Sequence, residues 1–326
     1  MAMALGGPEP ILYTRVNRSI TERWIGRPQK TIELTEGVLE LTREMFNVSA
    51  LTYIISFRGL ALAEVGRIEE AMSILKDGID VCEKFGVSIR LSCLYNSLGY
   101  CYGEIYQTER ALDFNCKGEE TARALMEKYP LGRRQYAEMA AQSSVNLMEN
   151  FFDQKKLDKA WSLMNSLAEE AKSEDFDMFR HQWESRMNCL AAQVLLQRND
   201  LGQAESIIQE NLRKTQKKKM KKREGCFLRL LGELQIKRNE FENGLKNLNQ
   251  AIQILKEIAN PRQLWQAYSS LALAHHKQGR SSEARENWKA AAEVIHDTAN
   301  IFSDREIKTS FLNTELIREV LSNAEN

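Results

Sequence analysis

A pattern of apolar and small residues recurs along the chain at a spacing of about 40 residues. Each copy has apolar residues at helical spacing, a tight turn, and a second apolar series that contains one small residue. Helical spacing on both sides of a turn predicts a pair of amphipathic helices, and such a pair buries its apolar face only by stacking on its neighbours. The small positions are Thr31, Ala71, Ala111, Ala160, Ala204, Gly244 and Ala284.

These copies predict an all-α fold, a solenoid of about seven stacked helix pairs with a C-terminal capping helix. We expect residues 11–299 to form the repeat array and residues 300–326 to form the capping helix and the end of the chain. Residues 1–10 are small and bear Gly and Pro, so we interpret them as an added leader outside the fold. Either Ser303 or Asp304 is expected to cap the last helix.

The spacing lengthens twice, to 49 residues after Ala111 and to 44 residues after Ala160. We therefore expect extra residues near 119–134, where Pro130 breaks a long helix, and near 173–179. The five prolines stand in the leader, at the first turn or between repeats, so that none interrupts a predicted helix.

The last copy resembles the tetratricopeptide repeat, and its residues are Tyr268, Leu271, Ala272, Gly279, Ala284, Trp288 and Ala291. The period exceeds the roughly 34 residues of the common repeat, as in repeat arrays of the maltose-activator type. Residues 260–265 and 299–312 also resemble the end of bacterial multidomain proteins that join an ATPase module, often with a cyclase or Ser/Thr kinase domain, to such an array. The resemblance implies that the solenoid is a right-handed superhelix and that it acts as an interaction or sensor region.

Composition excludes further classes of function. The chain has 45 basic and 45 acidic residues, and this balance argues against general nucleic-acid binding. No apolar run approaches the length of a membrane-spanning helix. The six cysteines form no C-x-x-C pair and are expected to be reduced, so we predict a cytoplasmic protein.

The motifs of several catalytic classes are missing from the sequence. It has no G-x-x-x-x-G-K-[ST], no H-E-x-x-H and no G-x-S-x-G. The adjacent His275 and His276 diverge by roughly 100° on a helix and do not chelate one metal together. We expect no enzymatic activity, no cofactor and no metal site.

The first helices of such repeats line a concave groove, and the register places a mixture of aromatic, amide and charged residues on it. This mixture suits an extended peptide, because aromatic rings supply contact area and amides bond its backbone. We predict a partner-binding groove centred on the second to fourth copies, with Tyr100 as its main anchor. Its residues are Tyr53, Phe57, Asn96, Tyr100, Asn146, Glu149, Arg186 and Arg229.

A basic segment, residues 213–223, holds eight basic residues in eleven. It is either a solvated connector or a contact for an acidic partner or nucleic acid. No aromatic residue is interleaved, so base stacking is not expected. The patch consists of Lys217, Lys218, Lys219, Lys221 and Lys222.

The sequence thus predicts a protein or peptide interaction module. One interpretation is the repeat region of a larger bacterial signalling or regulatory ATPase. A free-standing scaffold or adaptor and a repeat-type peptide receptor remain alternatives, and a nucleotide-binding domain encoded upstream of Ile11 would distinguish the first interpretation from the second.

Overall fold

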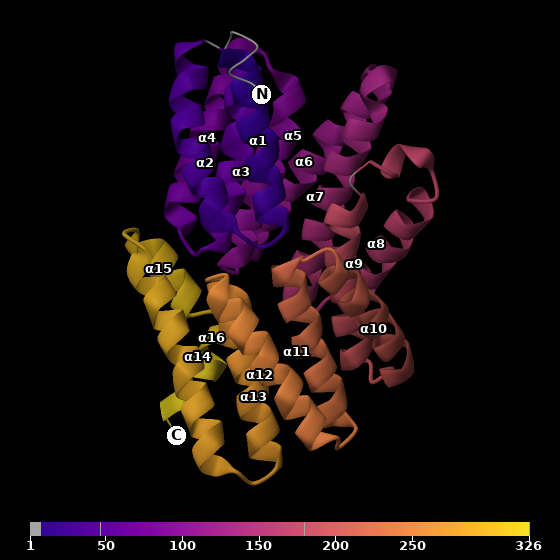
Figure 1. Cartoon of the computed structure of the whole chain (residues 1–326), viewed down its shortest axis with the longest axis vertical. Helices are drawn as coiled ribbons and strands as arrows, with labels where there is room; N and C mark the ends of the chain where they lie inside the picture. The colour runs from indigo at the N-terminus through magenta and orange to yellow at the C-terminus, as the bar shows by residue number, and fades with distance from the viewer. Residues whose placement is uncertain (1–7, 46, 179, 326) are drawn as a thin grey trace. The chain divides into compact units, whose positions relative to one another are not determined.

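The structure is a computed structural model that describes residues 8–45, 47–178 and 180–325, with side chains from Thr14 onward (Figure 1). All regular structure in these ranges is helical, and this confirms the predicted all-α class. None of the helices in the same ranges is long and apolar enough to cross a membrane. Residues 1–7 of the predicted leader lie outside the described residues, and the first helix begins at Pro8.

The helices belong to two compact units, which we describe separately. The first unit contains the residues up to Glu184 apart from 64–66, and the second contains residues 64–66 and 185 onward. Successive helices of the first unit pair as predicted for four repeats. They are α1 (Pro8–Trp24), α2 (Pro28–Glu44), α3 (Val48–Glu64), α4 (Ile68–Phe85), α5 (Ser88–Glu104), α6 (Thr108–Lys128), α7 (Arg133–Asp153) and α8 (Leu157–Glu170).

The second unit continues with three further helix pairs and two short helices. Its first helix, α9, starts within the first unit, since the division between the units follows Glu184. The elements are α9 (Arg180–Gln197), α10 (Leu201–Lys217), α11 (Lys221–Lys237), α12 (Phe241–Glu257), α13 (Pro261–Lys277), α14 (Ser281–Ile301), α15 (Arg305–Leu312) and α16 (Glu315–Glu325).

The small residues of the second helices lie where helices cross closely. Ala71, Ala111, Ala160 and Ala204 have no exposed surface. At Gly244 a Cβ atom would lie 2.7 Å from Cδ1 of Ile236 and 3.1 Å from the backbone oxygen of Gly232. A larger side chain at these positions would force the helices apart. In the first repeat Thr31 takes this position, and its hydroxyl donates to the Ser19 carbonyl at 2.7 Å.

The turn inside each repeat contains one residue in the left-handed conformation, always at the same register. Glycine, which adopts a positive φ without a steric penalty, takes this position in only three repeats. Successive members are spaced 40, 40, 49, 44, 40 and 40 residues apart, as the repeat register predicts. They are Gly26, Gly66, Tyr106, Lys155, Asn199, Asn239 and Gly279.

The extra residues after Ala111 mostly lengthen helices. Both α6 and α7 have 21 residues, whereas α3 and α5 have 17. The expected break is a short 3-10 turn, Pro130–Gly132. A second 3-10 turn, Glu174–Phe176, lies in the other expected insertion.

The predicted single capping helix is wrong in one respect, because the structure has two short helices there, α15 and α16. The backbone turns between them at residues 313–314, and α16 packs against α14. Asp304 caps α15 as expected, since its side chain accepts from the backbone N–H of Glu306 at 2.8 Å. Ile317 and Val320 are buried, whereas Leu316 is exposed.

Candidate functional site

Two aromatic residues on α3 begin the candidate site in the first unit. Tyr53 and Phe57 are one helical turn apart and both half-buried. Their rings meet edge to face, with centroids 4.9 Å apart and an interplanar angle of 83°. Burial raises the pKa of the Tyr53 hydroxyl to about 12, so the phenol stays protonated at neutral pH.

Helix α5 adds a cation and a thiol. The guanidinium carbon of Arg90 lies over the Tyr53 ring, 4.3 Å from its centroid. Cys93 lies three residues further along α5, and burial raises the pKa of its thiol to about 11. Both Arg90 and Glu138 act electrostatically on Tyr53 and on Cys93, which places the four side chains in one neighbourhood.

Helix α7 contributes Glu138, a carboxyl that is only 8% exposed. Burial raises its pKa from 4.5 to about 8, although a hydrogen bond from Gln142 opposes this shift. Gln142 Nε2 donates to Glu138 Oε1 at 3.0 Å. With the Gln182 amide oriented to satisfy its neighbours, its nitrogen donates to the same oxygen at 2.8 Å and its oxygen accepts from the Trp24 indole at 3.1 Å.

We call this group of side chains, drawn from three successive first helices, the first-helix site. It combines aromatic area, an amide, one cation and a carboxyl that is mostly protonated at neutral pH. Such a set can contact an apolar side chain, hydrogen-bond a peptide backbone and bind an anion. Its residues are Tyr53, Phe57, Arg90, Cys93, Glu138 and Gln142.

The structure does not place Asn96 and Asn146 on this surface, contrary to expectation. They are 5% and 2% exposed and belong to a buried amide network among α5, α6 and α7. Asn146 Nδ2 donates to Asn96 Oδ1 at 2.6 Å and to Asn115 Oδ1 at 3.0 Å. Asn115 Nδ2 in turn donates to Asn150 Oδ1 at 2.9 Å. These amides therefore hold helices together, because their bonding capacity is directed into the core.

Tyr100 is a poor anchor for the same reason. It is 7% exposed and packs within the core, so its ring offers little area to a partner. Glu149 is half-buried on α7. Of the predicted first-unit residues, only Tyr53 and Phe57 form a direct pair at the surface, and Tyr53 replaces Tyr100 as the central aromatic residue.

Arg186 and Arg229 belong to the second unit, whereas the residues of the first-helix site belong to the first. They are 7% and 6% exposed. Arg229 Nη1 donates to Glu233 Oε1, and the same oxygen accepts from the Ser270 hydroxyl at 2.6 Å. This ion pair on α11 is tied to α13 and has a structural role.

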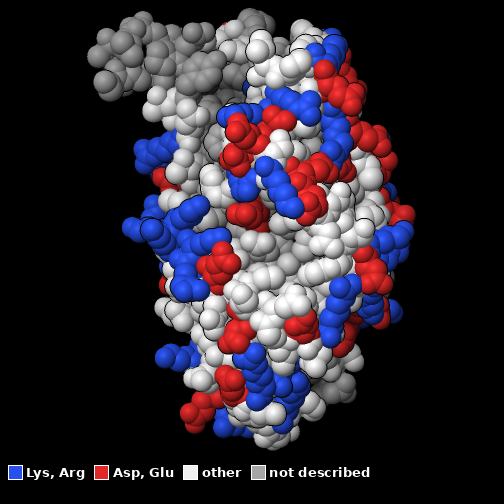
Figure 2. Space-filling view, turned by 90° about the vertical axis from the view of Figure 1, so that its right-hand side faces the viewer, with Lys and Arg blue, Asp and Glu red and all other residues white. Residues whose placement is uncertain are grey.

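The basic segment forms the end of α10, a turn and the start of α11. Lys217, Lys218, Lys219 and Lys221 are exposed, and Lys222 is half-buried. Lys221 pairs with Glu224 at 2.9 Å. Basic and acidic side chains are interspersed over the face of the molecule shown in Figure 2. A long polyanion would therefore meet repulsion close to any basic cluster on that face.

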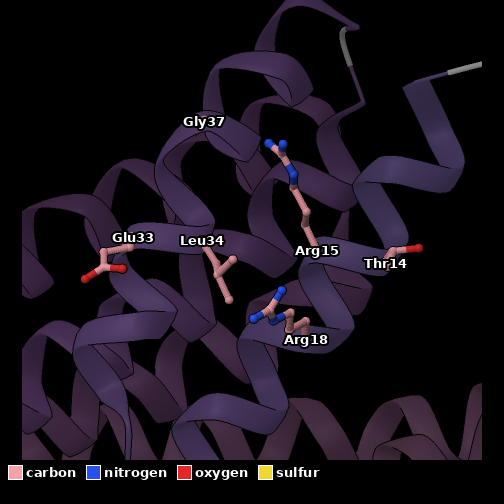
Figure 3. A pocket seen from close by; sticks show the side chains of 6 residues that line it. All are labelled: Thr14, Arg15, Arg18, Glu33, Leu34 and Gly37. Atoms are coloured by element: carbon pink, nitrogen blue, oxygen red, sulfur yellow. The ribbon is translucent and has the colours of Figure 1, made fainter. Parts of the chain in front are cut away.

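A shallow cavity of about 410 Å³ lies between α1 and α2. Arg15 and Arg18 line it from α1, and Leu34 and Glu33 line it from α2, with the Glu33 carboxylate pointing away from the two arginines (Figure 3). The two guanidinium groups point in different directions, and Glu33 pairs with Lys30 at 2.7 Å. The cavity therefore has no convergent anion site. Among the described residues, no group of three or more His, Cys, Asp or Glu side chains is arranged to hold a metal ion.

Sequence reasoning missed Arg90 and Glu138, although the register contained a signal for them. Cys93 and Gln142 follow Tyr53 at steps of 40 and 49 residues, which are the repeat steps. Arg90 is three residues before Cys93 and Glu138 is four before Gln142, so each shares its neighbour's helix face. Inspection of the positions one helical turn before Cys93 and Gln142 would have found both Arg90 and Glu138.

Comparisons with known proteins agree with this architecture. Residues 265–286 match the model of the tetratricopeptide repeat. A comparison with curated proteins gives no match. The match and the repeated helix pairs together give the chain a tetratricopeptide-type repeat fold.

Solved structures resemble the chain at low sequence identity. The crystal structure of the APC/C hetero-tetramer Cut9-Hcn1 has a TM-score of 0.62 at 13% identity, and the match covers 100% of this chain but 58% of that one. A Rap protein complexed with Competence and Sporulation Factor gives 0.60 at 14% identity, with 98% and 88% covered. NprR in complex with its cognate peptide NprX gives 0.56 at 15% identity, with 95% and 82% covered.

Proposed function

We propose that this chain is a non-catalytic module that binds a peptide or an extended protein segment at the first-helix site. The observation that carries the proposal is the half-buried Tyr53–Phe57 pair with Arg90 stacked on it. Binding energy usually concentrates in a few aromatic or Arg anchors, and this site supplies both kinds.

The similar structures support a peptide or protein ligand. One contains Competence and Sporulation Factor, a second contains its cognate peptide, and the third is a hetero-tetramer. The peptide-receptor alternative therefore gains support beside the scaffold alternative.

A finer part of the proposal is that the chain is the repeat region of a larger bacterial signalling or regulatory ATPase, acting in the cytoplasm. The resemblance of residues 260–265 and 299–312 to such proteins supports it. The complete reading frame of the gene tests it: an encoded nucleotide-binding domain is expected, and a frame without one would leave the scaffold or receptor interpretations.

Peptide binding can be tested without knowing the natural ligand. A displayed library of random peptides is selected on the full chain, and the recovered peptides are titrated by fluorescence anisotropy. Phe57→Ala should weaken binding by about 1–2 kcal/mol, the usual cost of truncating an aromatic anchor. Phe85→Ala is the matched control, because Phe85 is 60% exposed on α4 and lies outside the site.

The rival site is the basic segment. Binding there should fall steeply with added salt and should be lost when Lys217, Lys218 and Lys219 are all changed to Glu. Recovery of no peptide, or of peptides that respond to this triple change and not to Phe57→Ala, would overturn the proposed site.

A further inference from the structure

Two cysteines of the second unit form a buried thiol pair. Cys189 lies on α9 and Cys226 lies on α11, and the two residues are 5% and 1% exposed. The Cys189 thiol donates a hydrogen bond to the Cys226 sulfur, so the two sulfur atoms are in direct contact. Cys226 Sγ also lies 3.1 Å from Gln263 Oε1 on α13, to which its thiol donates. The pair therefore joins three helices through its sulfur atoms.

Basic side chains surround the Cys226 sulfur. Lys222 and Arg223 precede Cys226 by four and three residues and Arg229 follows it by three, so helical spacing places all of them beside it on α11. The hydrogen bond from Cys189 lowers the pKa of the Cys226 thiol, and the basic side chains lower it further, although burial opposes the shift. The same hydrogen bond raises the pKa of the Cys189 thiol. Cys226 is therefore the sulfur that ionises first, while Cys189 keeps its proton.

Arg229 provides a second observation, which comes from hydrogen bonding. It is only 6% exposed, and its Nη1 donates to Glu233. Its buried Nε has no hydrogen-bond partner within the described part of the chain. The guanidinium interacts electrostatically with both Cys226 and Cys189. A buried cation with a donor to spare, beside a sulfur atom, stabilises negative charge on that sulfur.

The other four cysteines lack this arrangement. Cys82 hydrogen-bonds with Thr52, and burial raises the pKa of its thiol. Burial also raises the pKa of the Cys93 thiol to about 11, and it raises the pKa of the Cys101 and Cys116 thiols. Because the thiolate is the form that reacts, these four thiols are less reactive at neutral pH than Cys226.

We propose that Cys189 and Cys226 are a redox-active dithiol, which a peroxide oxidises to a disulfide that links α9 to α11. With hydrogen peroxide, the Cys226 thiolate attacks one oxygen and the O–O bond breaks. This gives a sulfenic acid at Cys226, and the other oxygen leaves as hydroxide, which takes up the proton lost from the thiol and becomes water.

The second step forms the disulfide. The Cys189 sulfur attacks the Cys226 sulfur, the S–O bond breaks, and the proton of the Cys189 thiol leaves with the hydroxyl group as a second water. In total, two electrons pass from the dithiol to the peroxide. A small thiol reverses the reaction by exchange, so the pair can return to its reduced state.

The arrangement suits this reaction despite its burial. Hydrogen peroxide is hardly larger than water, Cys189 borders the surface at 5% exposure, and local opening exposes buried groups transiently. Because the two sulfur atoms are already in contact, they need only approach to about 2.05 Å for the disulfide to form. Cys189 is therefore placed to react with the sulfenic acid before further oxidation. This chemistry does not depend on the proposed peptide site.

The test uses the full chain, reduced and then freed of reductant. It is treated with hydrogen peroxide, blocked with iodoacetamide and digested without reduction, and circular dichroism establishes that the treated chain is folded. Mass spectrometry should show the Cys189 peptide joined to the Cys226 peptide, before the exposed Cys116 reacts, and dithiothreitol should restore both thiols. The inference is overturned if Cys116 is oxidised while Cys189 and Cys226 remain thiols, or if either of them joins a different cysteine.

Single variants test the role of each sulfur. In Cys189→Ser, peroxide should leave a sulfenic acid at Cys226 that dimedone captures, because the second thiol is gone. Cys226→Ser should give no dimedone adduct at Cys189. Cys82→Ser is the matched control, since Cys82 is another buried cysteine, and it should form the Cys189–Cys226 disulfide as the wild-type chain does.

The variants can also contradict the proposed mechanism. A dimedone adduct at Cys189 in Cys226→Ser, with none at Cys226 in Cys189→Ser, would overturn the assignment of Cys226 as the attacking sulfur. Disulfide mapping in the wild-type chain decides the inference even where a variant does not fold.

Discussion

The buried amide network makes a sharp prediction about Gly99 on α5. A Cβ atom at Gly99 would lie 2.3 Å from Asn115 Oδ1 and 2.5 Å from its Cγ, so Gly99→Ala requires the Asn115 amide to move. Asn115 has no exposed surface, and its Nδ2 donates to Asn150 Oδ1 at 2.9 Å. Movement of Asn115 therefore breaks a buried hydrogen bond.

The magnitude follows from two costs and one opposing gain. Leaving the Asn150 oxygen without its donor costs about 1–3 kcal/mol, and forcing an extra atom into a packed core costs about 1–3 kcal/mol. Replacing Gly by Ala inside a helix returns about 1 kcal/mol. Gly99→Ala should therefore lower the free energy of unfolding by about 1–5 kcal/mol.

The same change should be harmless once Asn115 is already small. In an Asn115→Ala background the clashing atoms are absent, so Gly99→Ala should be neutral or stabilising by up to about 1 kcal/mol. Urea denaturation of the four proteins measures this double-mutant cycle, and the coupling energy should exceed about 1 kcal/mol in magnitude. Effects that add within about 0.5 kcal/mol would refute the close approach of α5 and α6 at this point.

Three further predictions concern other parts of the chain. Ala284→Leu should lower the free energy of unfolding by about 1–3 kcal/mol, because Ala284 on α14 is only 4% exposed and a larger side chain would overpack the core there. An unchanged midpoint of urea denaturation would contradict that packing. Asp304→Ala should destabilise α15 by about 0.5–2 kcal/mol and increase its amide exchange, because the Asp304 carboxylate accepts from the first backbone N–H groups of the helix. The pKa of Glu138 is higher in the folded chain than in the unfolded one, so folding is favoured by protonation. Stability should fall as pH rises from about 4.5 toward about 8, with a slope of at most about 1.4 kcal/mol per pH unit from this group. Glu138→Gln should remove that contribution, and an identical slope in both proteins would show that Glu138 is not responsible.

The repeat register was predictable from sequence because it depends on local spacing. Apolar periodicity and the small residues of the second helices place all seven helix pairs. Only some of the turns could be located from the sequence. Gly26 and Gly279 indicate two of them, whereas Tyr106 and Lys155 adopt the same left-handed conformation although they are not glycine. A residue with a side chain can be held there by its flanking helices, and local sequence does not reveal this.

The site was less predictable because burial is a tertiary property. Asn96 and Asn146 lie on the helix face that the register assigns to the groove, but the close approach of α6 covers them. Gly118 permits that approach, since a Cβ there would lie 3.1 Å from the Asn96 backbone nitrogen. Tyr100 is covered in the same core, whereas Tyr53 stays half-buried. Spacing assigns residues to a face, but helix contacts decide which of them remain accessible.

The central claim, that a peptide ligand binds at the first-helix site, is tested most directly by site-specific photo-crosslinking. The photoreactive amino acid benzoylphenylalanine replaces Phe57 in one protein, the fully exposed Leu131 in a second and Lys218 of the basic segment in a third. After irradiation with a selected peptide, mass spectrometry identifies the adducts. The account predicts a covalent peptide adduct at position 57 that excess unlabelled peptide suppresses, with little adduct at positions 131 and 218. A suppressible adduct at position 218, with none at position 57, would contradict it.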